Sequence, residues 1–522
     1  MFSKFCNLFN KLIQKIKKDF NLYEFIVLLI YIIVIIVISL HHEFSLDENQ
    51  SFLITRDLNF FDMIAQLKHE GHSFIWYAML FPIAHLGFSI ETQKIIPILF
   101  SVLTAFIILK KAPFNKIVKL LLLFSPGMIY YYSCFSRPYC LIVFLLSCIA
   151  CIYKNKHEHP YAYSFLIGIL ANTHLVMVPV SFILEIIFLY DEKQLSKNKN
   201  EKNIINNKKI WISIIIFCLL FLIEAIFVLF GYYYCSIVTH YDSDLILLNI
   251  VELLSKTWIK TLKIYYGVGN TSVFYSIITG FVILLATIGS FFNLKKGIIF
   301  IVQFTFMYII HSFFWFVIPT RAYLSIYIIM FCLWISKESD SKDKGNIRIS
   351  NFLLYISLIL FIIITVPHNY KCIKEDYNKL FSTGKVTAKY IEENIPKNSV
   401  FLYLYLDYQQ SVAGNLDSND YKFYLALSDR YATFSSWDID YDYTVNKKYI
   451  LKLSKKIKEL EKNYKNVYIL VVDDIDSDVY TVAKLEKYYD IDLIYDSKKE
   501  NTMDDGLAWD IKYFKIYRVN KS

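Results

Sequence analysis

Charged residues are scarce in this sequence, and they are unevenly distributed along it. Only 19% of the 522 residues are Asp, Glu, Lys or Arg, whereas 56% are hydrophobic and the mean hydropathy is +0.40. The formal net charge is +9, but the excess Lys and Arg lies in short segments beside apolar runs. A contiguous basic face is missing, which argues against nucleic acid as a partner. The composition is typical of an integral membrane protein.

A complete cysteine motif for a metal is also missing. Among the nine cysteines, Cys148 and Cys151 have C-x-x-C spacing, but no second pair accompanies them. Because these two and Cys218 lie in apolar runs, we interpret them as inert buried thiols. The N-terminal region lacks the small-residue cleavage site of a signal peptide, so we expect its long apolar run to be retained as a span.

Long apolar runs predict a multi-pass α-helical membrane protein with about 11 spans. Lys-rich loops place the N-terminus in the cytoplasm and the C-terminal part outside the cell membrane. Residues 161–190 are long enough for a hairpin, with a break near Asn172 to His174. Residues 73–88 are apolar but short, and we expect them to enter the membrane without crossing it or to lie along its face. The predicted spans are 22–40, 93–109, 117–132, 139–153, the hairpin 161–190, 210–230, 272–292, 297–313, 322–336 and 351–366.

The pattern changes after about residue 370. Residues 400–406 and 466–472 are typical of short strands, and residues 378–394 and 448–463 of helices. Alternation of helix and strand predicts a small extracytoplasmic α/β domain at residues 370–522, after a transmembrane domain at residues 1–369. We expect this domain to be accessory, either covering a site or binding an acceptor.

The first external loop, residues 41–92, contains a polar segment next to the first span. It holds Asp47-Glu48, then Arg56-Asp57, then Lys68 to His72. Ionisable groups beside a span are costly unless water or partners satisfy them, so their concentration predicts a functional site. Asn59 is a plausible N-cap of a helix that ends at Gly71 and lies in the plane of the membrane surface. A solvated loop with a few aromatic residues is the alternative.

Three motifs in this order resemble the multi-pass glycosyltransferases of the GT-C class, specifically bacterial relatives of the protein O-mannosyltransferase and aminoarabinose transferase group. They are Asp47-Glu48 after the first span, Glu70-Gly71-His72, and the run from Ser125-Pro126 to Ser136-Arg137-Pro138-Tyr139. The resemblance covers roughly residues 20–330. One departure is His72-Ser73-Phe74, where the family usually has prolines after the histidine.

The resemblance implies a GT-C-like fold and an enzyme of the inner cell membrane. Its reaction would transfer a sugar from a polyprenyl-phosphate-linked donor to an envelope glycan, lipid or protein acceptor on the extracytoplasmic face. Asp47 is then expected to take or orient the proton of the acceptor hydroxyl. Glu48 would bind the sugar or help a metal.

Positive charge must meet the phosphate of the leaving lipid as its bond to the sugar breaks. Arg137 and Arg321 are the preferred candidates because a guanidinium binds phosphate through two hydrogen bonds. Arg56 and His72 also fall on the predicted external side, and Tyr139 belongs to the third motif. Each residue has a structural alternative, such as a helix cap for the acidic pair or a headgroup anchor for an arginine.

Metal binding stays open at this stage. Glu70 and His72 are candidate ligands for Mg²⁺, Mn²⁺ or Zn²⁺, but a closed set of four ligands is missing. Glu224 is a carboxylate inside a predicted span, and no partner for it can be named from the sequence. Alternative functions are a surface-polysaccharide polymerase or ligase, a transporter or flippase of lipid-linked sugars, and a non-enzymatic receptor. The identities of the sugar, the acceptor and the lipid depend on cavity shape.

Overall fold

The computed structural model describes most of the chain. The described residues are 21–70, 72–198, 207–238, 273–313, 318–337, 344–404, 409–417, 419–435, 446–473, 476–503 and 513–520.

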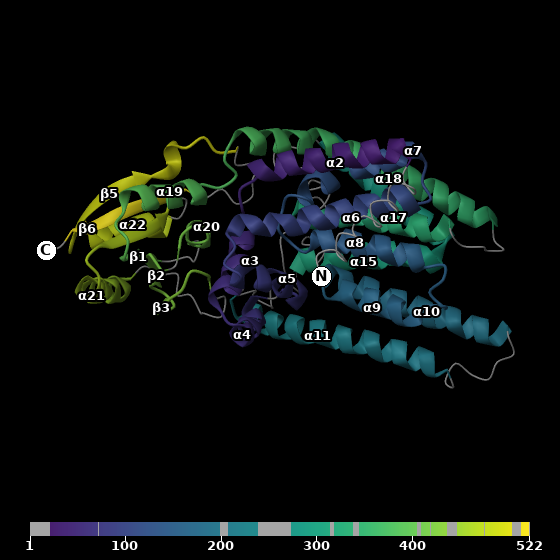
Figure 1. Ribbon diagram of the computed structural model, residues 1–522, viewed down its shortest axis with the longest axis horizontal. Coiled ribbons are helices and arrows are strands. Elements are labelled where there is room, and N and C mark those ends of the chain that lie inside the picture. Colours follow the sequence, from purple (N-terminus) through teal and green to yellow (C-terminus); the bar gives the residue numbers. More distant parts are fainter. Residues whose placement is uncertain are drawn as a thin grey trace, which may run out of the picture.

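The N-terminal part is helical, and its long helices run side by side along the long axis of the molecule (Figure 1). Its elements are α2 (Leu22–His41), α3 (Leu46–Asp57), α4 (Phe60–Glu70), α5 (Phe74–His85), η1 (Ile90–Lys94), α6 (Ile95–Lys111), α7 (Lys116–Leu123), η2 (Gly127–Tyr131), α8 (Tyr139–Ile152), α9 (Pro160–Ala171), η3 (Leu175–Met177), α10 (Val178–Asn198), α11 (Lys208–Val238), α14 (Val273–Phe292), α15 (Leu294–Phe313), α16 (Pro319–Ala322), α17 (Leu324–Lys337) and α18 (Lys344–Asn378).

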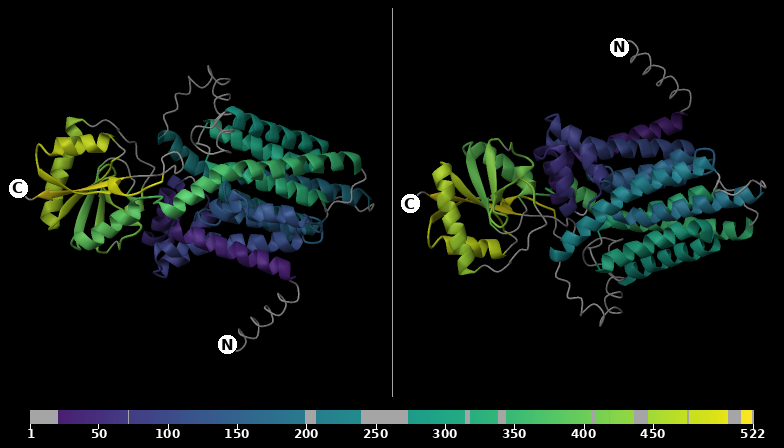
Figure 2. Two further views of the ribbon diagram at one scale, coloured as in Figure 1. Left: turned by 90° about the horizontal axis from the view of Figure 1, so that it is seen from above. Right: turned by 90° about the horizontal axis from the view of Figure 1, so that it is seen from below.

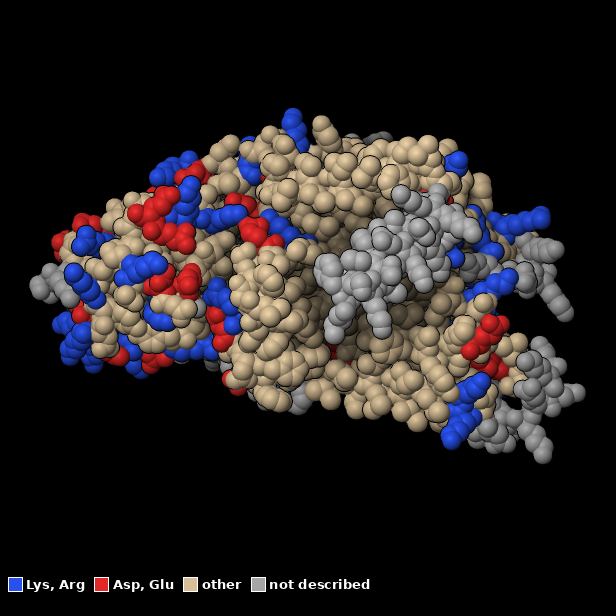
Figure 3. All heavy atoms as spheres, in the orientation of Figure 1, with Lys and Arg blue, Asp and Glu red and all other residues tan. Residues whose placement is uncertain are grey.

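Within the described residues, five helices are long and apolar enough to cross a membrane. Their outer faces carry large hydrophobic side chains, such as Phe25, Leu219 and Phe352, each more than half exposed. Charged side chains gather toward the two ends of the long axis and leave the helical region between them nearly uncharged on the face in Figure 3. A chain with this surface would be costly to hold in water, which confirms the multi-pass membrane class.

Two of the predicted apolar segments contain breaks in the structure, one expected and one not. Residues 161–190 fold as the expected hairpin: α9 ends at Ala171, and His174 caps η3 before α10 begins. Residues 117–132 do not form one helix, because α7 stops at Leu123 and Pro126 opens a π turn, η2. Proline lacks the N–H that would continue the helix, so this apolar run bends inside the protein.

Helix α5 contains 12 residues, which corresponds to about 18 Å at 1.5 Å per residue. It therefore cannot span a hydrocarbon layer of about 30 Å alone. Cys151 and Cys218 differ from their predicted burial, since both are exposed on helix surfaces. Apolar periodicity cannot separate a face toward lipid from one toward protein.

The C-terminal part is an α/β domain at one end of the helices (Figure 2), which confirms the predicted class. The sheet order is β3-β2-β1-β4-β6-β5, with β1 parallel to β2 and β4 and with β6 antiparallel to β4 and β5. Its elements are α19 (Gly384–Asn394), β1 (Ser399–Tyr403), α20 (Gln410–Ala413), β2 (Tyr421–Leu425), β3 (Arg430–Tyr431), α21 (Lys447–Asn463), β4 (Val467–Val472), α22 (Asp476–Leu485), β5 (Asp490–Asp496), η5 (Ser497–Lys499) and β6 (Phe514–Asn520).

The entry into this domain differs from the predicted helix over residues 378–394. Helix α18 continues from the apolar region to Asn378, and the separate helix α19 begins only at Gly384. Gly384 lies so close to Ser411 that a β carbon on it would meet the Ser411 carbonyl oxygen at 2.2 Å. Because of this close approach, α20 packs against α19. Helix α20 also packs against α3, and so connects the C-terminal domain to the helical part.

Candidate functional site

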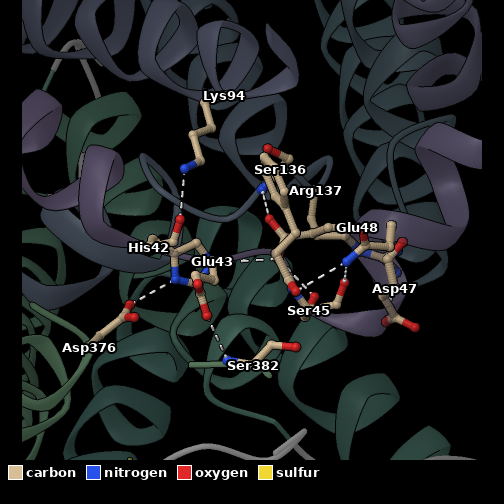
Figure 4. A network of polar contacts seen from close by, with 12 residues as sticks. His42, Glu43, Ser45, Asp47, Glu48, Lys94, Ser136, Arg137, Asp376 and Ser382 are labelled. Atoms are coloured by element: carbon tan, nitrogen blue, oxygen red, sulfur yellow. Dashed lines mark hydrogen bonds and ion pairs between the residues drawn. The ribbon is translucent and has the colours of Figure 1, made fainter. Parts of the chain in front are cut away.

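The start of α3 is fixed by a capping box. Ser45 is the N-cap, and the Glu48 carboxylate accepts hydrogen bonds from the Ser45 backbone N–H and hydroxyl, both at 2.8 Å. Glu48 is fully buried, whereas the side chain of the preceding Asp47 is 52% exposed. The two carboxylates of the acidic pair therefore point in different directions (Figure 4).

Glu48 also joins α3 to the third sequence motif. Its Oε1 atom accepts a hydrogen bond of 2.5 Å from the backbone N–H of Ser136, 88 residues further along the chain. Both carboxylate oxygens of Glu48 thus accept hydrogen bonds from the chain itself, so sugar binding by Glu48 stays a prediction without a contact to support it. By binding the backbone of Ser136, Glu48 places the next residue, Arg137, beside Asp47.

Arg137 is 7% exposed and meets α3 at several atoms. Its guanidinium lies 3.3 Å from the Asp47 carboxylate, and it donates to the Asp47 carbonyl at 3.2 Å and to the Ser51 hydroxyl at 3.4 Å. Burial alone would raise the pKa of Asp47, but the charges of Arg137 and its neighbours outweigh that effect and lower it. Asp47 is therefore ionised at neutral pH and open on one side.

His72 contacts the same guanidinium nitrogen as Asp47, with its Nε2 atom 3.3 Å from Arg137 Nη2. Burial and the positive charge of Arg137 lower the pKa of His72 to about 3, against a smaller opposing effect from Asp47. The ring is thus neutral at physiological pH, and its Nε2 accepts the hydrogen bond from Arg137. Sequence motifs far apart in the chain supply Asp47, His72 and Arg137, and the structure brings all three together.

His72 and Arg137 line a small pocket, and Asp47 lies next to it through its contact with Arg137. Trp76 also lines the pocket; it is 2% exposed, and its indole N–H has no hydrogen-bond partner among the described residues. The lining residues are Ser51, His72, Ser73, Trp76, Tyr77, Arg137, Pro138, Thr173, His174 and Leu175.

Glu224 of α11 has a partner at the edge of this pocket. Its Oε1 atom accepts a hydrogen bond of 2.7 Å from the hydroxyl of Ser73, and the side chain is buried. The contact attaches α11 to the segment that carries His72. Long-range pairing of this kind has no signal in the sequence.

Arg321 and Tyr139 form a second contact near the site. Arg321 Nε donates to the Tyr139 hydroxyl at 3.3 Å, and the Tyr139 ring lies 5.4 Å from that of His174, which lines the pocket. The positive charge of Arg321 also acts on Asp47 and His72. Both predicted residues therefore lie near the pocket, and their role in substrate binding stays a prediction.

Arg56 and Glu70 are placed elsewhere, at the contact between α3 and the C-terminal domain. Arg56 pairs with Asp57 at 2.7 Å and donates to the Leu416 carbonyl at 3.2 Å. Glu70 accepts from Gln50 at 3.0 Å. Gln50 in turn is bonded to Gln410 and Ser435 of the C-terminal domain.

A shared metal centre for Glu70 and His72 has no counterpart in the contacts, because the carboxylate faces amides and the ring faces a guanidinium. In the part of the chain that the structure describes, no three His, Cys, Asp or Glu side chains are grouped as metal ligands would be. Metal dependence stays untested.

The chain can be compared with known sequences and solved structures. No protein-family model matches the chain, and no curated protein matches it. The chain is similar to ArnT from Cupriavidus metallidurans bound to undecaprenyl phosphate. The match covers 96% of this chain and 98% of that one, with 11% identity and a TM-score of 0.46. A likeness at this level carries no argument about activity, which must come from the side chains described above.

Proposed function

We propose that the protein transfers a sugar from a polyprenyl-phosphate-linked donor to a hydroxyl acceptor of the cell envelope. The observation that carries the proposal is the half-exposed Asp47 carboxylate, held against the buried Arg137 guanidinium next to a pocket that Arg137 and His72 line. A carboxylate base and a phosphate-binding guanidinium are the two groups that this reaction requires. The order of the sequence motifs, which resembles the GT-C class, supports the same reaction.

Asp47 is the base of the proposed step. Its carboxylate accepts the proton of the acceptor hydroxyl, and the acceptor oxygen forms a bond to the anomeric carbon of the sugar. The bond between that carbon and the phosphate oxygen breaks, and the lipid phosphate leaves with the electron pair. A single displacement of this kind inverts the configuration at the anomeric carbon. The lowered pKa of Asp47 keeps it ionised and ready for the proton.

Arg137 and Arg321 stabilise the negative charge that develops on the leaving phosphate. Arg137 is largely removed from water, which strengthens its interaction with an anion. Neutral His72 holds the guanidinium through Nη2, which also contacts Asp47, without adding a second positive charge. The unpartnered Trp76 N–H is a donor for an oxygen of the sugar or phosphate.

The test compares envelope glycans by mass spectrometry in wild-type cells, in a deletion strain, and in cells that express Asp47→Asn at equal level. Asp47→Asn is expected to reach the membrane but to lose the same sugar as the deletion, because an amide cannot accept the proton. The missing mass would identify the sugar. Asp62→Asn is the matched control, since Asp62 lies on α4 in the same loop but is exposed and away from the pocket.

A full glycan profile in the Asp47→Asn strain would overturn the assignment of the base. The polymerase or ligase and the flippase would then be the functions to test. A changed profile in the Asp62→Asn strain would show that the assay responds to any loss of charge in this loop.

A further inference from the structure

His42, which directly follows α2, lies between two carboxylates from distant parts of the chain. Its Nδ1 atom is 2.7 Å from Asp376 Oδ2, and its Nε2 atom is 3.5 Å from Glu48 Oε2 (Figure 4). The ring is fully enclosed, with Phe135 and Phe381 packed against it. Sequence patterns do not single out this histidine.

The far side of this bridge is itself held in place. Asp376 lies near the end of α18, and its Oδ2 atom also accepts a hydrogen bond of 2.7 Å from the Tyr130 hydroxyl. The Lys94 ammonium group donates to the carbonyl of His42 at 2.7 Å. Ring and backbone of His42 are therefore fixed by α18, η1 and η2 together.

We propose that His42 is a positioning residue for sugar transfer, which holds Asp47 and Arg137 in place by tying Glu48 to Asp376 at the end of α18. The inference rests on the proposed function. Its path is short: Glu48 follows Asp47 in sequence, and the Ser136 N–H that Glu48 binds precedes Arg137. A shift of the Glu48 carboxylate would move both reacting side chains relative to each other.

The charges around the ring support a doubly protonated imidazole. The groups that face it are Glu48 from α3, Asp376 from α18, Tyr130 from η2, the neighbouring Glu43, and Lys94 from η1, whose ammonium reaches the His42 carbonyl. Burial would lower the pKa of His42, but the two carboxylates raise it to about 9. Burial raises the pKa of Glu43 to about 7, so this side chain adds little negative charge in acid solution.

The protonation sets the direction of the pH dependence. The pKa of folded His42 lies above the ordinary value of 6.5, so the stabilisation from its two ion pairs is complete below pH 6.5 and is lost as the pH rises through about 9. Positioning of Asp47 and Arg137 should fail over the same alkaline range. The proposed external location of the site would expose it to the pH of the medium.

The experiment measures the initial rate of glycan modification after induction, in media from pH 6.5 to 9.5, at equal protein level. His42→Phe keeps the ring volume among Phe135 and Phe381 but loses both ion pairs. It is expected to slow modification by about tenfold to a hundredfold, the size of effect of a small misplacement of reacting groups. Its rate should also lose the alkaline decline of the wild type. His85→Phe is the control, at an exposed histidine that ends α5.

Asp376→Asn is the second variant, in case His42→Phe does not reach the membrane. It removes one carboxylate from His42, so the alkaline decline should begin at a lower pH than in the wild type. A wild-type rate and an unshifted decline in Asp376→Asn would overturn the proposal. A wild-type rate in correctly folded His42→Phe would overturn it as well.

Failure of this inference can be told from failure of the proposed function. If Asp47→Asn loses the sugar while His42→Phe keeps the wild-type rate, only the role of His42 is wrong. If neither variant changes the glycan, the assignment of Asp47 as the base is wrong as well, and if the deletion strain also keeps the full glycan, the proposed transfer reaction is wrong.

Discussion

A group of charged side chains lies at each end of helix α8, and the two groups differ in how far their carboxylates are exposed. Near its start, Arg137 pairs with Asp47, whose side chain is 52% exposed. Beyond its end, Lys156 pairs with Asp191 at 2.9 Å, and these side chains are only 5% and 13% exposed. Lys295 approaches the other oxygen of Asp191, and His157 pairs with Glu192 at 2.8 Å.

The difference shows what separates a reactive site from a structural anchor. At the Lys156 end the described charges are satisfied by one another, and their contacts join α10 and α15 to the segment after α8. At the Arg137 end a carboxylate remains accessible next to a pocket that Arg137 lines. Ion pairs are common to both ends, so the accessible carboxylate next to a pocket is the distinguishing feature.

The largest expected effect is on the rate of glycan modification, after removal of the Arg137 guanidinium. Arg137→Leu is expected to slow glycan modification by about a thousandfold, since loss of one charge-stabilising donor costs about 10²–10³ in rate and this side chain supplies several. Arg137→Lys keeps the positive charge but loses the planar guanidinium, so its rate should lie between those of the wild type and Arg137→Leu. The rate is measured at equal membrane level by mass spectrometry. More than a tenth of the wild-type rate in Arg137→Leu would contradict the role of Arg137.

At the anchor end the opposite pattern is expected. Lys156→Met keeps the apolar stem but leaves Asp191 with one partner fewer, which should cost about 3 kcal/mol of stability. Thermal unfolding of the purified protein in detergent would show the loss, whereas the modification rate per folded molecule should stay at the wild-type value. A lowered rate at unchanged stability would place function at this end too.

A smaller effect concerns the neutral histidine of the pocket. The pKa of His72 is about 3 when folded and about 6.5 when unfolded, so the unfolded chain binds a proton first and stability falls as the pH drops from 6.5 toward 3. Between pH 6.5 and pH 5, the free energy of unfolding should therefore fall by up to about 2 kcal/mol more in the wild type than in His72→Gln. Unfolding temperatures at the two pH values, in both proteins, are the measurement.

The other titrating groups do not obscure this comparison. Glu43, with a pKa of about 7 when folded, contributes in the opposite direction, but it does so equally in the wild type and in His72→Gln. The contribution of His42 is complete below pH 6.5. An equal acid-induced loss in both proteins would show that His72 is not held neutral.

Local patterns in the sequence predict part of this site and fail on the rest for a physical reason. Asp47, His72 and Arg137 stand in motifs, and Asn59 caps α4 as expected, accepting hydrogen bonds from the backbone N–H groups of Phe61 and Asp62. His42 lies 334 residues from Asp376, so their pairing depends on the complete fold.

The fold shows the same division. Apolar runs locate the long helices, and the near-continuous run in β4 locates a central strand. Strand β5 escapes prediction because its buried and exposed positions do not alternate regularly. Arg56 is predicted to bind substrate, but in the structure it donates to the carbonyl of Leu416 in the C-terminal domain. Local sequence patterns do not show how that domain packs on α3.

The backbone bond from Ser136 to Glu48 has a consequence for protein engineering. In the dipeptides Asp47-Glu48 and Ser136-Arg137, one residue of each makes this hydrogen bond and the other makes the ion pair between Arg137 and Asp47. The double substitution of Asp47→Glu with Glu48→Asp would preserve composition and charge, yet the shorter carboxylate would have to accept the hydrogen bond from Ser136 and the longer one would have to serve as the base. A graft of this centre onto another helical scaffold would therefore have to transplant both dipeptides as units, with their peptide planes in register.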